Sequence, residues 1–157
     1  MKTNTLDEKM MAARLARDVR TYYAGEIAKM RVDERDMRTL YFLMKGAPDT
    51  PYEGGEYVVR MTLPESYPFE PPSMAFLTPS GRFVAGAAIC TTFSAHHPEA
   101  WSAGNTLSTL VISIASFMTD ESDGLGSLRA SAQERASLAA SSASYNEAHG
   151  YAAMFHQ

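Results

Sequence analysis

Cys90 is the only cysteine of the chain and the residue best suited to covalent chemistry. It precedes two threonines and lies in an irregular stretch, residues 78–104, that shows no helical or strand periodicity. Irregular segments of that length in compact domains are usually functional. We therefore expect an exposed, reactive thiol at Cys90, because the thiolate is the attacking form of the residue. The alternative is a small buried hydrophobe, which is what a lone cysteine most often is.

Two adjacent histidines, His96 and His97, follow Cys90 in the same stretch. Either could act as a general base for an incoming amine or hydroxyl, and the combination leaves open a Cys–His hydrolase. The competing interpretation is that both histidines only order the loop. No metal or nucleotide site is predicted, because one cysteine cannot build a cysteine zinc site and the sequence contains no P-loop motif.

The composition is that of an ordinary soluble protein. The chain has 157 residues, 45% of them hydrophobic, and a formal net charge of −4. This size predicts a single domain over residues 1–157, and the acidic balance argues against a nucleic-acid-binding protein. The longest apolar region, residues 107–118, is too short to span a bilayer, which needs about 20 apolar residues.

The elements that must position Cys90 follow an α+β order. A helix with a capping box at Thr5 and Glu8 is expected first, with an apolar face of Met11, Leu15, Val19 and Tyr22. Strands are predicted over residues 27–32, 39–44, 57–63 and 74–77, joined by short turns as an antiparallel meander. After the long loop, helices are predicted over residues 107–118, capped by Asn105, and 131–145, with a last short one ending near Phe155.

Three arginines of the first helix, Arg14, Arg17 and Arg20, fall roughly opposite its apolar face. A solvated helix face is one interpretation of this row. The other is a docking surface for an acidic partner.

An ordered set of motifs surrounds Cys90. The stretch Pro64-Glu65-Ser66-Tyr67-Pro68-Phe69-Glu70-Pro71-Pro72 precedes a strand, then Thr78-Pro79-Ser80, Cys90, Trp101 and a helix. This order resembles that of ubiquitin-conjugating enzymes over nearly the whole chain. Three further pieces resemble the branch that is usually tail-anchored in the endoplasmic reticulum membrane: Gly81-Arg82-Phe83, His97-Pro98-Glu99-Ala100-Trp101 and Leu125-Gly126-Ser127.

The resemblance implies the ubiquitin-conjugating fold and a function. Cys90 would accept ubiquitin as a thioester from a ubiquitin-activating enzyme and pass it, usually with a RING-type ligase, to Lys, Ser or Thr of a protein substrate. No cofactor would be bound, since ATP is used only by the separate activating enzyme. The expected location is cytoplasmic, or the cytosolic face of the endoplasmic reticulum if a natural membrane anchor is missing from this chain.

The resemblance also assigns roles near Cys90. Ser80 stands where the family has an asparagine that orders the loop or stabilises the oxyanion; the alternative is that Ser80 only ends a turn. His97 is the candidate base. Asp123, with Asp120 and Glu121 as its rivals, would orient the acceptor lysine.

Other residues match the family's partner-binding and structural positions. Phe69, Ala103 and Gly104 match the two loops that contact RING-type ligases; the alternative for Phe69 is a core residue. Arg14 and Arg17, from the arginine row of the first helix, are further candidate partner-binding residues. The structural set is Tyr67, Pro68, Pro71, Pro72 and Trp101. The Tyr67–Pro68 bond is often cis in the family, and Trp101 is expected to pack under the loop with its indole N–H hydrogen-bonded.

Three alternatives remain at this point. The chain could carry another ubiquitin-like modifier by the same chemistry. It could be a non-catalytic variant that only binds ubiquitin or a partner enzyme. It could also be the Cys–His hydrolase, which would cleave a ubiquitin adduct and accumulate no thioester.

Overall fold

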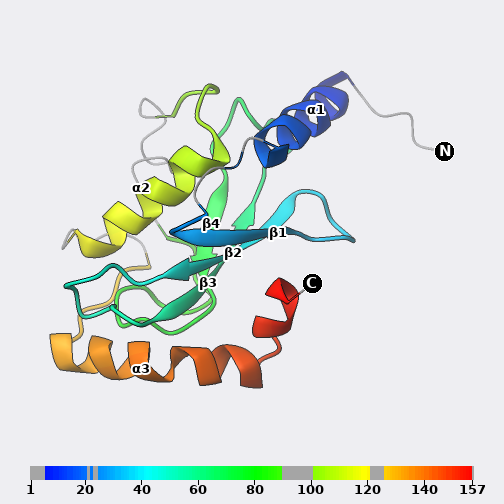
Figure 1. Ribbon diagram of the computed structural model, residues 1–157. Coiled ribbons are helices and arrows are strands. Elements are labelled where there is room, and N and C mark those ends of the chain that lie inside the picture. The colour runs from blue at the N-terminus through cyan, green and yellow to red at the C-terminus, as the bar shows by residue number, and fades with distance from the viewer. Residues whose placement is uncertain (1–5, 21, 23–24, 90–100, 121–125, 157) are drawn as a thin grey trace.

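The computed structural model describes residues 6–20, 22, 25–89, 101–120 and 126–156. In chain order the elements are α1 (Leu6–Arg20), β1 (Ala28–Val32), β2 (Thr39–Lys45), β3 (Glu56–Thr62), β4 (Ser73–Phe76), α2 (Leu107–Thr119), α3 (Ala132–Ala148) and the short 3-10 helix η2 (Ala152–Phe155). Figure 1 shows α2 and α3 flanking the strands from opposite sides. The predicted α+β order is confirmed.

The four strands form one antiparallel sheet in the order β1-β2-β3-β4, which is the predicted meander. Alternate residues of β2 are buried, as their period of two predicts. The register aligns them with buried residues of the neighbouring strands: Phe42 pairs with Val59, which in turn pairs with Phe76. These inward rows form one wall of the core.

Strand β3 is buried on both faces at its centre. Val58 and Val59 point to opposite faces, and both are fully buried. Helix α3 packs against β3, so this part of the sheet is covered twice. The simple alternation expected for β3 therefore holds for Val59 but not for Val58.

Helix α2 supplies the other wall of the core. Its buried residues are Leu107, Leu110, Val111, Ile114 and Met118, at the helical spacing that the sequence predicts. The predicted cap is wrong by one residue: Thr106 is the N-cap, and its side-chain oxygen accepts a hydrogen bond from the Thr109 backbone N–H. Asn105 instead turns its carbonyl oxygen toward Arg14, which donates to it at 2.8 Å.

The other helices agree closely with their predicted positions. On α1, Met11 and Leu15 are buried, while Thr5 of the predicted capping box lies outside the described residues. Helix α3 starts after Ser131, whose hydroxyl accepts from the Glu134 N–H. It extends three residues beyond the predicted end.

In the part of the chain that the structure describes, no helix is long and apolar enough to cross a membrane. The single domain predicted for residues 1–157 stays a prediction.

Two residues of α2 give a direct test of this core. Leu110 is fully buried and Ile112 is 45% exposed. Leu110→Ala should lower the free energy of unfolding by about 2–5 kcal/mol, because it removes buried methyl groups and leaves a cavity. Ile112→Ala is the matched control and should change it by about 0.5 kcal/mol or less. Urea unfolding followed by circular dichroism measures both, and equal effects would contradict this packing.

Candidate active site

Several predicted site residues lie outside the described residues. These are Cys90, His96, His97, Glu121 and Asp123. The structure does describe the chain that enters this region, up to Ile89, and the chain that leaves it, from Trp101. The described residues on either side of Cys90 form the frame that supports the candidate site.

The chain that leads to Cys90 is fixed to the edge of the sheet. Ile89 is buried, and its backbone N–H donates to the carbonyl oxygen of Met74 in β4 at 2.9 Å. Gly86 N–H donates to the Phe76 carbonyl oxygen at 2.7 Å, and Ala88 forms an isolated antiparallel bridge with Ala75. The residue before Cys90 is thus held in place by backbone hydrogen bonds to β4.

The same chain is also held from a second side. Phe83 forms an antiparallel bridge with Ser127. Val84 N–H donates to the Gly126 carbonyl oxygen at 2.7 Å, and Leu128 N–H donates to the Arg82 carbonyl oxygen at 2.8 Å. Residues 82–89 are therefore clamped between β4 and residues 126–128.

Ser80 closes a turn at the start of this clamp. It is fully buried, and its hydroxyl oxygen accepts hydrogen bonds from the N–H groups of Arg82 (3.1 Å) and Phe83 (3.3 Å). A hydroxyl with that burial and those partners orders the loop and is poorly placed to reach a substrate. The geometry favours the alternative that Ser80 ends a turn over the family asparagine's oxyanion role.

A buried polar network fixes the turn from the side of α3. The Thr78 hydroxyl donates to Asn146 Oδ1 and accepts from the Val58 N–H. Asn146 Nδ2 donates to the Glu56 carbonyl oxygen, while the Glu56 N–H donates to the Ser142 hydroxyl. These hydrogen bonds give partners to the polar backbone groups at the start of β3, and they tie α3 to the loop that begins the clamp.

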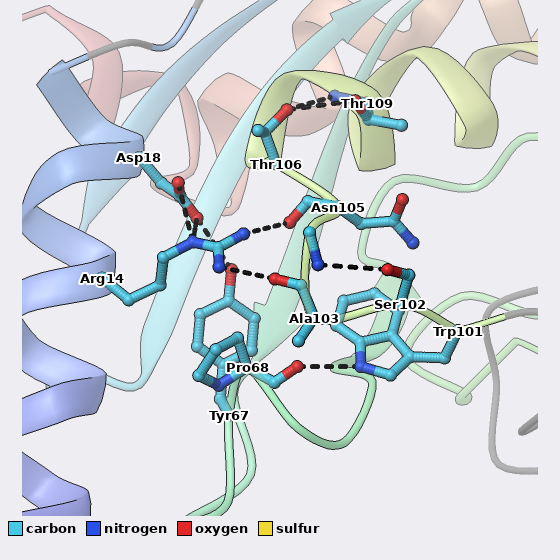
Figure 2. Close-up of polar contacts among 11 residues, drawn as sticks. Arg14, Asp18, Tyr67, Pro68, Trp101, Ser102, Ala103, Asn105, Thr106 and Thr109 are labelled. Atoms are coloured by element: carbon cyan, nitrogen blue, oxygen red, sulfur yellow. Dashed lines mark hydrogen bonds and ion pairs between the residues drawn. The ribbon is translucent and has the colours of Figure 1, made fainter.

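Trp101 is half-buried and contacts the loop between β3 and β4, and its indole N–H has the hydrogen-bond partner that was predicted for it. Its indole N–H donates to the Pro68 carbonyl oxygen at 2.9 Å, and its ring lies 6.4 Å from that of Tyr67 (Figure 2). The Tyr67–Pro68 peptide bond is cis, and both residues are buried. The indole hydrogen bond joins the loop between β3 and β4 to the loop before α2.

Arg14 connects helix α1 to the loop before α2. Its guanidinium pairs with Asp18 at 3.1 Å and donates to the carbonyl oxygens of Ala103 (2.5 Å) and Asn105 (2.8 Å), as Figure 2 shows. Only 18% of the Arg14 side chain is exposed. The prediction that Arg14 belongs to a solvated helix face is wrong, because carbonyl oxygens of this loop accept hydrogen bonds from its guanidinium inside the protein.

The same network reaches Tyr67. Its hydroxyl donates to Asp18 Oδ2 at 3.1 Å, and Asp18 itself is 2% exposed. Burial, and then the negative charge of Asp18, raise the pKa of Tyr67 well above its ordinary value. Tyr67 therefore remains a neutral hydrogen-bond donor at physiological pH.

The remaining predicted residues are placed as follows. Phe69 is 60% exposed, so the alternative that it is a core residue is wrong. Gly104 is exposed, and its N–H donates to the Ser102 hydroxyl. Arg17 is exposed on α1, Pro71 is partly buried and Pro72 is buried.

Sequence reasoning missed three residues of the frame. The sequence analysis did not predict Asp18 as the anion beside Arg14. It included Arg82 and Gly126 in motifs but assigned them no structural role. Asp18 could have been found from its position four residues after Arg14 on a predicted helix, because residues at that spacing lie side by side. For Arg82 the signal was weaker: a charged residue beside apolar Phe83 and Val84.

A comparison with protein families matches residues 13–147 to the model described as "Ubiquitin-conjugating enzyme". The chain belongs to the ubiquitin-conjugating enzyme family. The match runs from α1 to the end of α3 and so includes the clamp, Cys90 and Trp101.

Relatives and solved structures within the family agree. Ubiquitin-conjugating enzyme E2 6 of Candida glabrata is 36% identical over 116 residues, which are 74% of this chain and 47% of that protein. Human ubiquitin-conjugating enzyme E2 J1 is 41% identical over 100 residues, 63% of this chain and 31% of that protein. The structure of human ubiquitin-conjugating enzyme E2 G1 superposes with a TM-score of 0.60 at 26% identity, covering 74% of this chain and 99% of that one.

The matched part is thus about half, or less, of these two curated relatives. The superposition and the element order together identify the ubiquitin-conjugating fold.

The Arg14 network predicts a measurable coupling between α1 and the loop before α2. Arg14→Ala should lower the free energy of unfolding by about 2–4 kcal/mol, because it removes the cation beside the buried Asp18 carboxylate and frees two carbonyl groups. Exposed Arg20, on the same helix, is the control. Arg20→Ala should cost about 0.5 kcal/mol or less. Urea unfolding of both variants tests this, and an Arg14 variant as stable as the Arg20 variant would refute the network.

Proposed function

We propose that this chain accepts ubiquitin as a thioester on Cys90 and passes it to a protein substrate. In the first step the Cys90 thiolate attacks the thioester carbonyl carbon of ubiquitin on the activating enzyme. A new C–S bond forms to Cys90, and the activating enzyme's sulfur leaves as a thiolate. In the second step an acceptor amine or hydroxyl attacks the same carbon, the C–S bond breaks, and the acceptor's proton passes to a base or to water.

The observation that carries this proposal is the position of the chain's only sulfur nucleophile. Cys90 lies inside the residues that match the family, directly after a residue whose backbone is fixed to β4. Acyl transfer gains rate when the attacking group is held in place, because the entropy of positioning it has already been lost on folding. The clamp on residues 82–89 supplies that positioning up to Ile89.

The partner surface of the proposal includes Phe69, Ala103 and Gly104, for a RING-type ligase. Phe69 exposes an aromatic ring, a residue type enriched in protein interfaces. The Trp101–Pro68 hydrogen bond joins its loop to the loop of Ala103, and Arg14 holds the Ala103 carbonyl group. These contacts support a rigid, two-loop surface that needs little ordering when a partner binds. Arg17, exposed on α1, extends the proposed partner-binding surface.

The roles of the acid and base residues belong to the same proposal. His97 serves as the base that takes the acceptor's proton, and Asp123 orients the acceptor lysine. The Ser80 hydroxyl is hydrogen-bonded within its own turn. The oxyanion is therefore stabilised by other donors, such as backbone N–H groups. No bound cofactor takes part, and ATP is consumed by the activating enzyme alone.

The substrate and location follow from the branch resemblance. We propose protein substrates modified on Lys, and on Ser or Thr, at the cytosolic face of the endoplasmic reticulum. The similarity to E2 6 and E2 J1 enzymes supports that branch.

The reaction can be tested by incubating the chain with ubiquitin-activating enzyme, ATP and ubiquitin. A non-reducing gel should show a new band that is larger by one ubiquitin and disappears with thiol reductant. Cys90→Ala should give no band, because no other cysteine can replace it. Cys90→Ser should give an oxyester that resists reductant, or no adduct.

Parallel reactions with other ubiquitin-like modifiers, each with its own activating enzyme, decide the modifier. A stable thioester with ubiquitin alone supports the proposal. If only another modifier forms the thioester, that modifier replaces ubiquitin in the proposed function. A correctly folded chain that forms no reductant-sensitive adduct with any modifier would refute the acyl-carrier function.

A further inference from the structure

A cavity of about 300 Å³ lies between the carboxyl end of helix α2 and the sheet. Ligand sites in proteins are usually concave, mostly apolar and about 300–1,000 Å³ in volume, so this cavity is large enough for a small molecule. None of the described residues that line it belongs to the clamp or to the proposed partner surface. The apolar part of its lining consists of Ile27, Met44, Pro48, Tyr52, Ala115 and Met118.

The floor of the cavity is made of core residues. Met44, Tyr52 and Met118 are 1%, 2% and 4% exposed. The Tyr52 ring meets the Tyr57 ring edge to face, with 6.4 Å between the ring centres. Side chains packed in this way are already ordered, so an apolar ligand binds here without the cost of ordering the floor.

The loop between β2 and β3 forms one wall of the cavity and is held by its own hydrogen bonds. The Thr50 hydroxyl donates to the Ala47 carbonyl oxygen at 2.7 Å and accepts from the Tyr52 N–H at 3.2 Å. At the start of the loop, a Cβ atom on Gly46 would collide with the Tyr52 carbonyl oxygen. Glycine therefore lets the loop return this closely, and the wall is formed before any ligand binds.

Glu26, just before β1, is exposed at the mouth of the cavity. Lys45 also borders the cavity, but residues of β2 alternate between the two faces of the sheet, and Lys45 faces away from α2 beside its cross-strand neighbour Glu56. The carbonyl end of α2 already holds the Arg82 guanidinium, which donates to the Met118 carbonyl oxygen. The Glu26 carboxylate is therefore the charged group that a ligand meets at this mouth.

We propose that this cavity binds a small primary amine with an apolar body, such as an alkylammonium or arylalkylammonium ion. The apolar body fills the space beside Met44, Tyr52 and Met118, where burial of apolar surface is favourable. The ammonium group stays at the mouth and donates to the Glu26 carboxylate. A carboxylate of similar shape binds less well, because it meets a like charge. This site is independent of the proposed transfer from Cys90.

Binding can be measured on the whole chain, near neutral pH, with phenethylamine, phenethyl alcohol and phenylpropanoate, which share one apolar body. Isotope-labelled methionine methyl groups report the site directly in NMR spectra, since Met44 and Met118 line the cavity. Met61 and Met74, buried elsewhere in the sheet, are the reference. Phenethylamine should shift the Met44 and Met118 signals with a dissociation constant on the order of 1 mM or below. The reference signals should stay in place.

Two variants separate the mouth from the cavity. Glu26→Gln removes the negative charge and should weaken phenethylamine binding about threefold, while the affinity for phenethyl alcohol stays within about twofold of wild type. In Ala115→Leu the larger side chain fills the cavity, and both compounds should bind about tenfold more weakly or not at all. Ser116→Leu is the matched control, because it adds the same bulk at an exposed position of α2 that does not line the cavity. It should leave both affinities unchanged.

The methionine signals need no variant, so the site can be tested even if Ala115→Leu does not fold. Shifts of Met44 and Met118 that are lost in Ala115→Leu and kept in Ser116→Leu would support the site. Met44 and Met118 signals that do not move with phenethylamine would overturn the inference. So would phenylpropanoate binding as tightly as phenethylamine, or a phenethylamine affinity that is unchanged in Glu26→Gln.

Discussion

The structure depends on a backbone constraint around residues 82–89. This stretch leads to Cys90 but belongs to no helix or long strand, so its polar backbone groups need partners elsewhere. It finds them in β4 on one side and in residues 126–128 on the other. Segments that are far apart in the sequence are thereby brought to the chain that ends at Ile89. The candidate site exists where these segments meet.

Buried polar side chains complete what the backbone bonds begin. Arg82 reaches the end of α2, and the Thr78–Asn146 pair connects the loop to α3. Arg135, 7% exposed, donates from α3 to the carbonyl oxygens of Gly81 and Leu128. Each bond ties a helix to the loop that leads to Cys90. A loop held in this way can carry chemistry without the cost of ordering it when the substrate arrives.

The opposite end of the site is organised by a second internal charge pair. Arg14 and Asp18 lie one helical turn apart, yet their partners, Ala103 and Tyr67, come from two different loops. The indole N–H of Trp101 joins these two loops directly. Helix α1 is therefore part of the frame of the proposed partner surface. The exposed ring of Phe69 projects from this frame.

Local pattern was enough to predict much of this molecule. The alternation in β2 and the apolar spacing in α2 gave the right elements, because each depends on one face being buried. The ordered motifs around Cys90 gave the family. Trp101 could be predicted to need a hydrogen-bond partner, since a buried indole N–H requires one.

What the sequence could not supply was the partner of each polar group, because partners come from distant parts of the chain. Arg14 was predicted on an exposed helix face, either solvated or used for docking, but its guanidinium donates to the Ala103 carbonyl oxygen inside the protein. The N-cap of α2 is Thr106 and not Asn105, whose backbone carbonyl oxygen accepts from Arg14. Ser80 resembled a catalytic position, yet two N–H groups of its own turn bind its hydroxyl. The sequence alone determined the elements and the family, through local periodicity and motif order; only tertiary packing decided which charges are buried, because burial depends on the neighbours that folding brings together.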